Sequence, residues 1–231
     1  AFQSQNLLNA DLKSIETEFE RLSRFYKYFF KTLLPEDKKS FIIDLPCGHG
    51  NVLYFLKNEG FQNSKGYDID PGRVEISKSL GFDAEVSNAL NKIKSFNNNI
   101  DVIFSLDFLE HIDKEDALNY IQDCYNALKP GGILIVRTPV TDSLRGGLDL
   151  FNDFTHKWAV NSSVLVGVFR QAGFKNVLLK DERPQPYKCI NLIRLIVFNV
   201  FKSITNFYLL CLGFSRIKVW STSCFIIATK E

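Results

Sequence analysis

The amino-acid sequence predicts an α/β fold with a doubly wound, mostly parallel sheet that carries helices on both faces. Short apolar, β-branched runs alternate with helix-like segments between about residues 38 and 139. Such alternation is typical of right-handed strand–helix–strand units, which bury a parallel sheet between helices. With 231 residues, 45% of them hydrophobic, the chain suits a single domain with a full core.

The first elements are an N-terminal helix and a strand–helix pair. Apolar positions recur at helical spacing through residues 11–34 and stop at Pro35, which predicts a helical cap within residues 1–37. The run "FIIDL" then predicts a buried strand. The following "NVLYFLKNEG" predicts a helix that ends at Gly60.

Three more strands follow. "KGYDID" predicts the second strand, and the next helix begins at Pro71, with Asp70 better explained as its N-cap than as a ligand. "AEVSN" predicts a weak third strand and "DVIFSL" a clear fourth.

A helix at about residues 114–128 leads to the fifth strand. The turn "KPGG" precedes that strand, "ILIVRTP", and the cofactor-binding core is expected to span residues 38–139.

Residues 140–231 form an acceptor-side region. The loop 140–160 is too long for a simple connector and suits a lid or binding segment. A helix at 162–172, ended by Gly173, leads to the strand "KNVLLKDE", and "TSCFIIATKE" is the last strand.

The loop in "FIIDLPCGHGN" has the position of a nucleotide-binding loop, because ligands of doubly wound sheets bind at the carboxyl ends of strands. A dinucleotide fingerprint needs a third glycine, where this chain has Leu53. Asp44 would also repel a phosphate, and no G-K-[ST] follows. A second acid, Asp68, lies where a ribose would be held. The pattern therefore favours a phosphate-free nucleoside that bears an ammonium group.

These motifs together resemble class I S-adenosylmethionine-dependent methyltransferases over roughly residues 38–182. The matching segments, in order, are "DLPCGHG", "GYDIDP", "SNAL", "DVIFSLDFLEHI" and "LKPGGILIVRTP". The resemblance implies a Rossmann-like sheet, mostly parallel with an antiparallel last strand, and S-adenosyl-L-methionine as cofactor.

The resemblance also implies a role for each cofactor-site residue. Asp44 would orient the loop and the ammonium, and Gly48 and Gly50 would allow close approach. Pro46 replaces the family's first glycine, so it should have negative φ while the two glycines do the bending.

The remaining cofactor contacts come from three strand ends. Asp68 would accept bonds from the ribose hydroxyls, and Ile69 would pack on the adenine. The amide oxygen of Asn88 and the backbone of Ala89 would read the adenine edge. The methionine end would lie against Leu106 and Asp107.

Histidines are the candidate general bases for a hydroxyl acceptor. His156 is the sharper candidate, because "DFTH" resembles a segment of bacterial methyltransferases associated with surface-polysaccharide and O-antigen gene products, and Asp153 would lie near it. The alternative is that Asp153 caps a turn and His156 packs on Trp158. His111, in "LEHI", is a second candidate or braces its loop together with Glu110.

Two histidine assignments are disfavoured. His49 lies within the cofactor loop and is a weak catalytic candidate. A metal site formed by Asp149, Asp153 and His156 is also disfavoured, so no metal is expected.

The segment 187–213 predicts an amphipathic helical insertion. Between residues 183 and 230 the chain has seven basic residues and no acid, which suits a membrane interface or a lipid-linked acceptor. The favoured alternative is that its apolar face is buried on the domain or in a homodimer, because most amphipathic helices face a core. Its longest uncharged run, residues 203–215, is too short to span a bilayer.

The sequence thus predicts a methyltransferase for O-methylation of a bacterial sugar or polysaccharide, as in O-antigen biosynthesis. Alternatives are a quinone-like or other small apolar acceptor, or a catalytically inactive cofactor-binding partner. The net charge of +2 gives no reason to expect nucleic acid. Five isolated cysteines favour a reducing, cytoplasmic setting, with peripheral contact at the inner face of the membrane through 187–213. The charged N-terminal residues do not resemble a signal peptide.

Overall fold

The computed structural model describes residues 2–147, 151–182 and 189–231. Its contacts divide the chain into two compact units. The first unit comprises Ala1–Ser105 and Asn126–Leu134, and the second comprises Leu106–Tyr125 and Ile135–Glu231.

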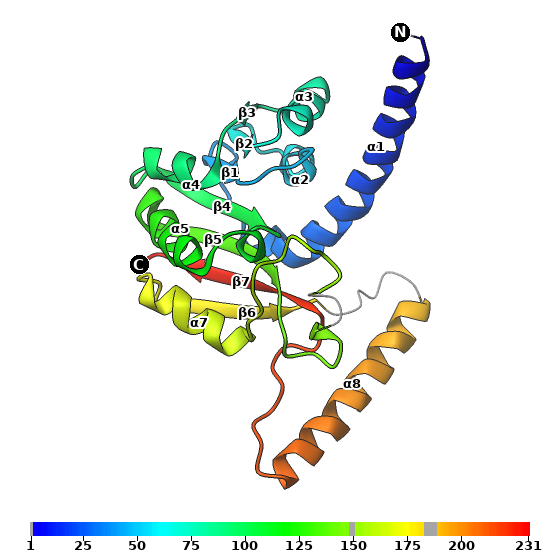
Figure 1. The fold of residues 1–231 in the computed structure, drawn as a ribbon, viewed down its shortest axis with the longest axis vertical. Helices are drawn as coiled ribbons and strands as arrows, with labels where there is room; N and C mark the ends of the chain where they lie inside the picture. Colours follow the sequence, from blue (N-terminus) through cyan, green and yellow to red (C-terminus); the bar gives the residue numbers. More distant parts are fainter. Residues whose placement is uncertain (1, 148–150, 183–188) are drawn as a thin grey trace. The chain divides into compact units, whose positions relative to one another are not determined.

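Seven strands form a mixed sheet with helices around it, in the order β3-β2-β1-β4-β5-β7-β6 (Figure 1). The strands are β1 Ile42–Asp44, β2 Ser64–Asp68, β3 Ala84–Val86, β4 Ile100–Leu106, β5 Leu128–Pro139, β6 Asn176–Asp181 and β7 Ser223–Thr229.

The pairing confirms the predicted Rossmann-like class. β1 pairs in parallel with both β2 and β4, and β2 pairs in parallel with β3. β6 and β7 pair antiparallel, as expected for the end of the sheet. In this register Asp44 lies opposite Gly66 on one side and Phe104 on the other, so β1 is central and fully buried.

The helices of the first unit are α1 Phe2–Phe30, α2 Asn51–Asn58, α3 Pro71–Ser79 and α4 Ala89–Lys92. Asp70 is the N-cap of α3, as predicted, and accepts from the N–H groups of Gly72 and Arg73. The predicted stop of the helical segment before Pro35 is confirmed, since helical backbone runs to Leu33. α1 ends at Phe30 and tightens into a 3-10 turn, and Leu34 is already extended because a residue before proline avoids the α region.

The second unit contains α7 Ser162–Gln171 and α8 Cys189–Cys211, and most of α5 Lys114–Ala127. The prediction of a turn at "KPGG" is wrong, because these residues belong to β5. Gly131 adopts φ +81 within the strand, a conformation that glycine tolerates and that does not end β5.

Helix α8 differs most from expectation. Its apolar face is not buried on the domain, since none of its residues is buried. The expectation that this segment is too short to span a bilayer is also wrong on length and composition. Among the described residues, α8 is the one helix that is long and apolar enough to cross a membrane. The expectation counted only the uncharged run, whereas the helix continues through its two basic residues. Residues 187 and 188 of the predicted insertion lie outside the described part.

The core of the first unit should depend on Phe30, which is fully buried and packs against Tyr26 and Phe104. We predict that Phe30→Ala lowers the free energy of unfolding by about 3–5 kcal/mol, measured by urea denaturation. Tyr28→Ala, at an exposed position of the same helix, should cost less than about 1 kcal/mol. Equal losses in the two variants would contradict this packing.

Candidate active site

The loop after β1 bends at its glycines, as predicted. Gly48 has φ +53 and Gly50 has φ +97, and Pro46 is not among the described residues with positive φ. The Leu45–Pro46 peptide is cis. A Cβ on Gly48 would point into open space, so the loop has a free face at this residue.

Asp68 ties this loop to the end of β2. Its two carboxylate oxygens accept hydrogen bonds from the N–H groups of Gly48 at 2.8 Å and of Asp70 at 2.9 Å. A carboxylate has about four lone-pair sites, so Asp68 can still accept bonds from a ligand. Its predicted ribose contact stays a prediction, and a positioning role is now added to it.

Asp44 is the residue whose surroundings fit a bound ligand most clearly. Its side chain is only 2% exposed, and among the described residues its Oδ1 has no hydrogen-bond partner. Burial, and then the charge of Asp68, raise the pKa of Asp44 well above its usual range. A buried acceptor without a partner beside a second carboxylate suits a cation or a hydrogen-bond donor. The residues present therefore fit the ammonium-bearing nucleoside that the sequence resemblance implies.

The predicted adenine contacts differ in availability. Ile69 is 66% exposed and free to pack on a flat ring. Asn88 is the N-cap of α4, so its amide oxygen already accepts from Leu90 and Asn91 and would have to be shared with an adenine. Ala89 is buried directly behind it.

Leu106 and Asp107 belong to the second unit, at the end of β4. Asp107 has φ +53, and its carboxylate receives two 2.6 Å hydrogen bonds from Arg137 Nη1. Arg137 also bonds Glu182. Sequence reasoning missed both partners, although a lone arginine in the apolar strand "ILIVRTP" was a usable signal.

A second cluster centres on His111. The hydroxyl of Thr155 lies 2.6 Å from Asp153 Oδ1 and 2.9 Å from His111 Nδ1. This hydroxyl has one hydrogen, and donating it to Asp153 leaves Thr155 an acceptor toward His111. The hydrogen-bond pattern therefore assigns the hydrogen to Nδ1 and leaves the Nε2 lone pair available.

His156 lies against His111, with ring centroids 4.8 Å apart. The loop holding it is fixed by two bonds: the N–H of Lys157 donates to the Glu110 carbonyl at 2.8 Å, and Trp158 Nε1 donates to the Ile112 carbonyl at 2.8 Å. The structure thus brings together the predicted residues His111, Asp153 and His156. Thr155, which links two of them, was missed.

One alternative is partly correct. Asp153 does cap a turn, since its Oδ1 also accepts from the Thr155 N–H. The packing of His156 on Trp158 stays a prediction, beside the contact of His156 with His111 and the bond from Trp158 to Ile112. In the first unit, His49 lines a cavity of about 560 Å³ along α3.

Glu110 is the buried member of the cluster. It is 2% exposed and accepts a bond from Thr138 at 3.0 Å. Burial chiefly raises the pKa of Glu110 to about 7. Burial, and then His156, lower the pKa of His111. The imidazole of His111 is thus favoured in its neutral form, in which Nε2 can accept a proton.

The ligand atoms of Glu110, His111 and His156 lie within 4.8 Å of one another, a set that could hold a divalent cation. This set differs from the disfavoured metal site of the sequence analysis. Asp149, a member of that earlier set, lies outside the described residues.

An apolar cavity of about 500 Å³ lies between α5 and α7 of the second unit, extending to Trp158. Its apolar lining includes Leu118, Ile121, Val160 and Leu165. It offers room for an apolar group of small-molecule size.

Comparison with known proteins gives a family match. The family model described as "Methyltransferase domain" matches residues 15–179, which is well over half of the chain. The match extends from α1 to β6 and includes the glycine loop and His111.

Curated relatives are distant and differ in named activity. A tRNA U34 carboxymethyltransferase of Pseudoalteromonas translucida (strain TAC 125) is 26% identical, over 61% of this chain and 46% of the relative. A phosphoethanolamine N-methyltransferase of Plasmodium falciparum (isolate 3D7) is 24% identical, over 63% and 57%. The chain therefore spans about half the length of the curated relatives it matches.

Solved structures agree in fold. A SAM-dependent methyltransferase from Archaeoglobus fulgidus matches with a TM-score of 0.68 and 25% identity, over 93% of this chain and 94% of that one. The phosphoethanolamine N-methyltransferase 2 of Haemonchus contortus, in complex with S-adenosyl-L-methionine, has a TM-score of 0.61 at 16% identity, over 88% and 50%, which supports the fold alone.

The cofactor loop is tested by Asp68→Ala. We predict at least a tenfold loss of affinity for S-adenosylhomocysteine in calorimetry, because Gly48 loses its anchor and a ribose loses its acceptor. Asp70→Ala removes only the cap of α3 and should change affinity by less than threefold. Unchanged affinity in Asp68→Ala would place the cofactor elsewhere.

Glu110 should make stability depend on pH. Because its folded pKa of about 7 exceeds the ordinary 4.5, its contribution is fully present below pH 4.5 and is lost as pH rises through 7. The difference corresponds to about 3 kcal/mol at most. Glu110→Gln should therefore gain stability over the unmodified chain at pH 8 but little at pH 4.5, in urea denaturation. Glu115→Gln, at an exposed position of α5, should show the same stability difference at both pH values.

Proposed function

Because the chain belongs to the methyltransferase domain family, we propose that it is an S-adenosylmethionine-dependent O-methyltransferase that acts on a sugar hydroxyl. When bound, S-adenosylmethionine supplies a methyl group on a positively charged sulfur, open to in-line displacement by a nucleophile. The chain's own residues then have to bind and align the acceptor, exclude water and take up the hydroxyl proton.

The observation that carries this proposal is the linked set Asp153–Thr155–His111. The Thr155 hydroxyl accepts a hydrogen bond from the Nδ1–H of His111, so Nε2 carries the lone pair that can accept a proton. Asp153 fixes the hydroxyl of Thr155 and favours the positive imidazolium that proton uptake creates. This arrangement supports His111 as the general base.

His156 has a supporting role in this proposal. Sequence reasoning favoured it as the base, yet the described bonds assign a tautomer only to His111. Its proximity lowers the pKa of His111, which keeps that base neutral near pH 7.

The sugar acceptor rests on the segment "NDFTHKWAV", which contains Asp153 and His156 and resembles polysaccharide-associated methyltransferases. The curated relatives are named for other acceptors, tRNA and phosphoethanolamine among them. The expectation that no nucleic acid is bound rests on balanced charge alone. Methyl incorporation from labelled cofactor should therefore be measured on cell-envelope glycans, on tRNA and on phosphoethanolamine. Incorporation into glycans is the expected result, and incorporation into another acceptor alone would overturn the sugar assignment.

A second candidate is an apolar small-molecule acceptor such as a quinone-like phenol. It is favoured by the apolar cavity of about 500 Å³ beside Trp158. Leu165→Asp, within that cavity, should then abolish methylation of the apolar acceptor; unaffected turnover would exclude the cavity as its binding site.

For the base, we predict that His111→Asn lowers kcat by about 10²–10⁴-fold while leaving S-adenosylhomocysteine affinity within threefold. His156→Asn should lower kcat less. Because the pKa of His111 lies below its ordinary 6.5, kcat/KM should stay flat above pH 7 and fall only at lower pH. Thr155 is a positioning residue, so Thr155→Val should alter this pH profile and Thr155→Ser should restore it. A larger loss in His156→Asn than in His111→Asn would reverse the assignment.

Chelation separates the base from a metal role. With His111 as a base, incubation with EDTA should leave turnover unchanged. Loss of turnover that Zn²⁺ or Mn²⁺ restores would instead identify Glu110, His111 and His156 as metal ligands.

A further inference from the structure

We propose that α8 and the segment after it, residues 189–218, form an anchor that lies in the plane of an anionic membrane surface. Hereafter these residues are called the anchor segment. The ligand class is acidic phospholipid, with apolar side chains inserted among acyl chains and basic side chains near the headgroups. The proposal does not depend on which acceptor is methylated.

A helix on the surface of a protein in water usually buries its apolar face and exposes its polar one, and α8 does the reverse. Its partly buried residues form one stripe that faces the rest of the second unit, and this stripe contains polar residues. Lys202 Nζ lies 3.8 Å from Asp181 Oδ2, and Asn206 Oδ1 accepts from the Ile217 N–H at 2.9 Å. The stripe comprises Asn191, Leu195, Phe198, Lys202, Thr205, Asn206 and Leu209.

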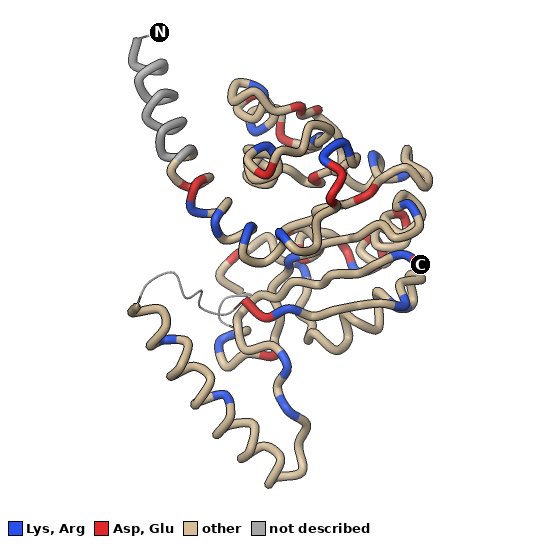
Figure 2. Tube along the Cα trace, turned by 180° about the vertical axis from the view of Figure 1, so that it is seen from behind, with Lys and Arg blue, Asp and Glu red and all other residues tan. Residues whose placement is uncertain are grey.

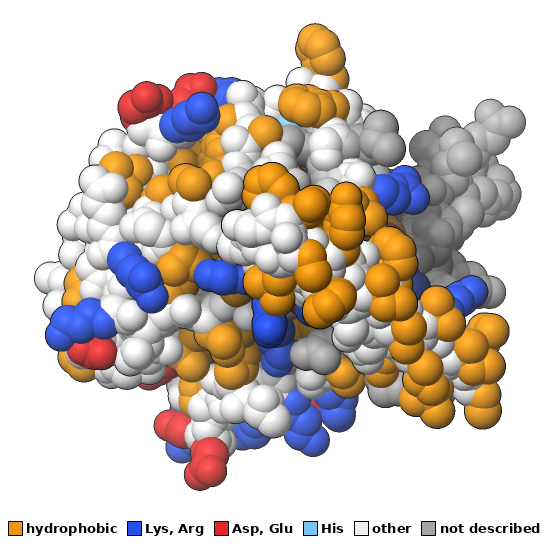
Figure 3. Space-filling model, turned by 90° about the horizontal axis from the view of Figure 1, so that it is seen from below, with side chains coloured by type: hydrophobic (Ala, Val, Ile, Leu, Met, Phe, Trp, Pro, Cys, Tyr) orange, Lys and Arg blue, Asp and Glu red, His pale blue; other side chains and the backbone are white. Residues whose placement is uncertain are grey.

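The opposite face is almost wholly apolar and exposed, and Figure 3 shows hydrophobic side chains gathered over α8. Phe207 is 70% exposed and Ile204 is 63% exposed. A face of this size is unfavourable in water and marks an interaction site. Its exposed large apolar residues are Ile190, Leu192, Ile193, Ile196, Val197, Val200, Phe201, Ile204, Phe207, Tyr208 and Leu210, continued by Leu212 and Phe214.

The basic residues around α8 favour an anionic lipid surface as the partner of its apolar face. No acid occurs from residue 183 to 230, and Figure 2 shows only basic positions coloured along α8. Arg194, Arg216 and Lys218 are exposed. A second copy packed through this face in a two-fold dimer would bring basic residues together without acidic partners. An anionic lipid surface instead complements them, at about 1 kcal/mol for each basic residue near the surface.

Topology excludes a membrane-spanning helix. The 23 residues of α8 measure about 35 Å, enough for a bilayer core of about 30 Å. However, β6 and β7 on either side of the insertion pair with each other, so the chain leaves and returns at one place. Residues 212–222 would have to recross the lipid as irregular backbone carrying Arg216 and Lys218, which bilayers do not tolerate.

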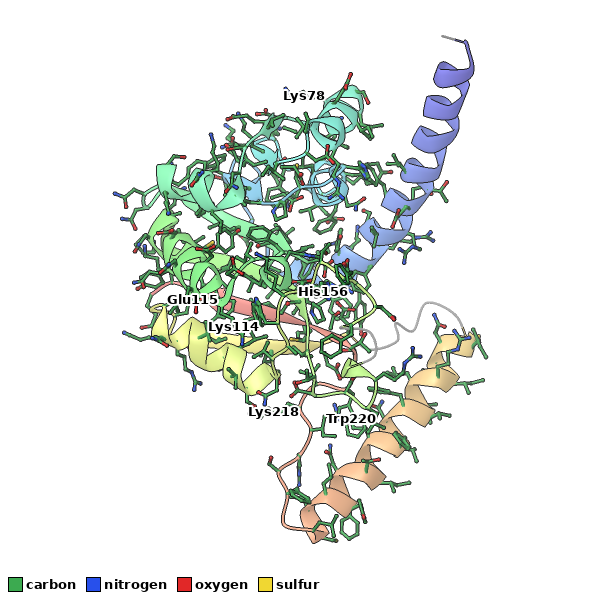
Figure 4. All side chains as sticks on the ribbon, in the orientation of Figure 1. Lys78, Lys114, Glu115, His156, Lys218 and Trp220 are labelled. Atoms are coloured by element: carbon green, nitrogen blue, oxygen red, sulfur yellow. The ribbon has the colours of Figure 1, made fainter. Side chains whose placement is uncertain are left out.

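Residues 212–222, the return segment, also run back along the helix. Trp220 contacts the rings of both Phe198 and Phe201, and it lies beside α8 in Figure 4, which labels it. Its indole N–H donates to the Ile217 carbonyl at 3.0 Å. The return segment thus covers the inner side of α8, and the apolar side is left for the membrane.

Vesicle flotation tests the anchor with the full chain. Vesicles of phosphatidylglycerol and phosphatidylethanolamine should float the protein, and pure phosphatidylcholine vesicles should bind at least tenfold less. Ile204→Asp and Phe207→Asp should each reduce binding at least tenfold, since both add a charge to the inserted face. Raising salt from 0.05 to 0.5 M should weaken binding several-fold.

Leu178→Asp is the matched control, because Leu178 is similarly exposed, at 55%, on β6. It should leave vesicle binding unchanged. All variants should keep S-adenosylhomocysteine affinity within threefold, which separates lost anchoring from misfolding or from failure of the proposed function. Absence of binding to anionic vesicles overturns the proposal. So does a soluble dimer that Ile204→Asp converts to monomer, because a second copy would then occupy the face.

Discussion

The parallel pairing of β1 with β2 brings two carboxylates, Asp44 and Asp68, to neighbouring strand ends, and the cofactor loop depends on this pair. Asp68 is satisfied by two backbone N–H groups, one of them from Gly48 in the loop. Asp44 is buried with an oxygen that lacks a partner among the described residues. Burial and the neighbouring Asp68 make a negative charge on Asp44 unfavourable, so the pair favours a ligand that brings positive charge or hydrogen-bond donors. The bend at Gly48 and Gly50 gives such a ligand access.

Burial acts in the same way on the ionisable groups of the histidine cluster in the second unit. Burial raises the pKa of Glu110 and lowers the pKa of His111, so both groups are favoured in their neutral forms. The positive charge that His111 would gain on accepting a proton is favoured by Asp153, through Thr155. Neutral groups at rest, with an acid nearby to stabilise the charged form, are what a proton acceptor requires near pH 7.

The membrane anchor proposed for α8 would add a location to the chemistry proposed for the second unit. An enzyme held at a membrane surface meets lipid-linked acceptors at a higher local concentration than in solution. The anchor segment and the methyltransferase family assignment thus support a common picture, although they rest on different residues. The antiparallel pair β6 and β7 explains how the chain can carry so apolar a helix without disrupting the sheet. The insertion starts and ends at neighbouring strand ends, and the pairing continues beneath it.

By itself the sequence determined the order of strands and helices, because hydrophobic periodicity and the Gly and Pro positions are local signals. It also predicted the bending at Gly48 and Gly50, which the backbone confirms. The cofactor role of the acids beside this loop stays a prediction. Tertiary structure alone decided the partners of the other site residues: Arg137 on Asp107, Thr155 between Asp153 and His111, and Glu110 close to both histidines. The bonds of Arg137 to Asp107 and of Thr155 to His111 join residues 30 and 44 positions apart, which no local pattern encodes. It also decided which face of α8 is covered, since a helical pattern shows that two faces differ but not what each one meets.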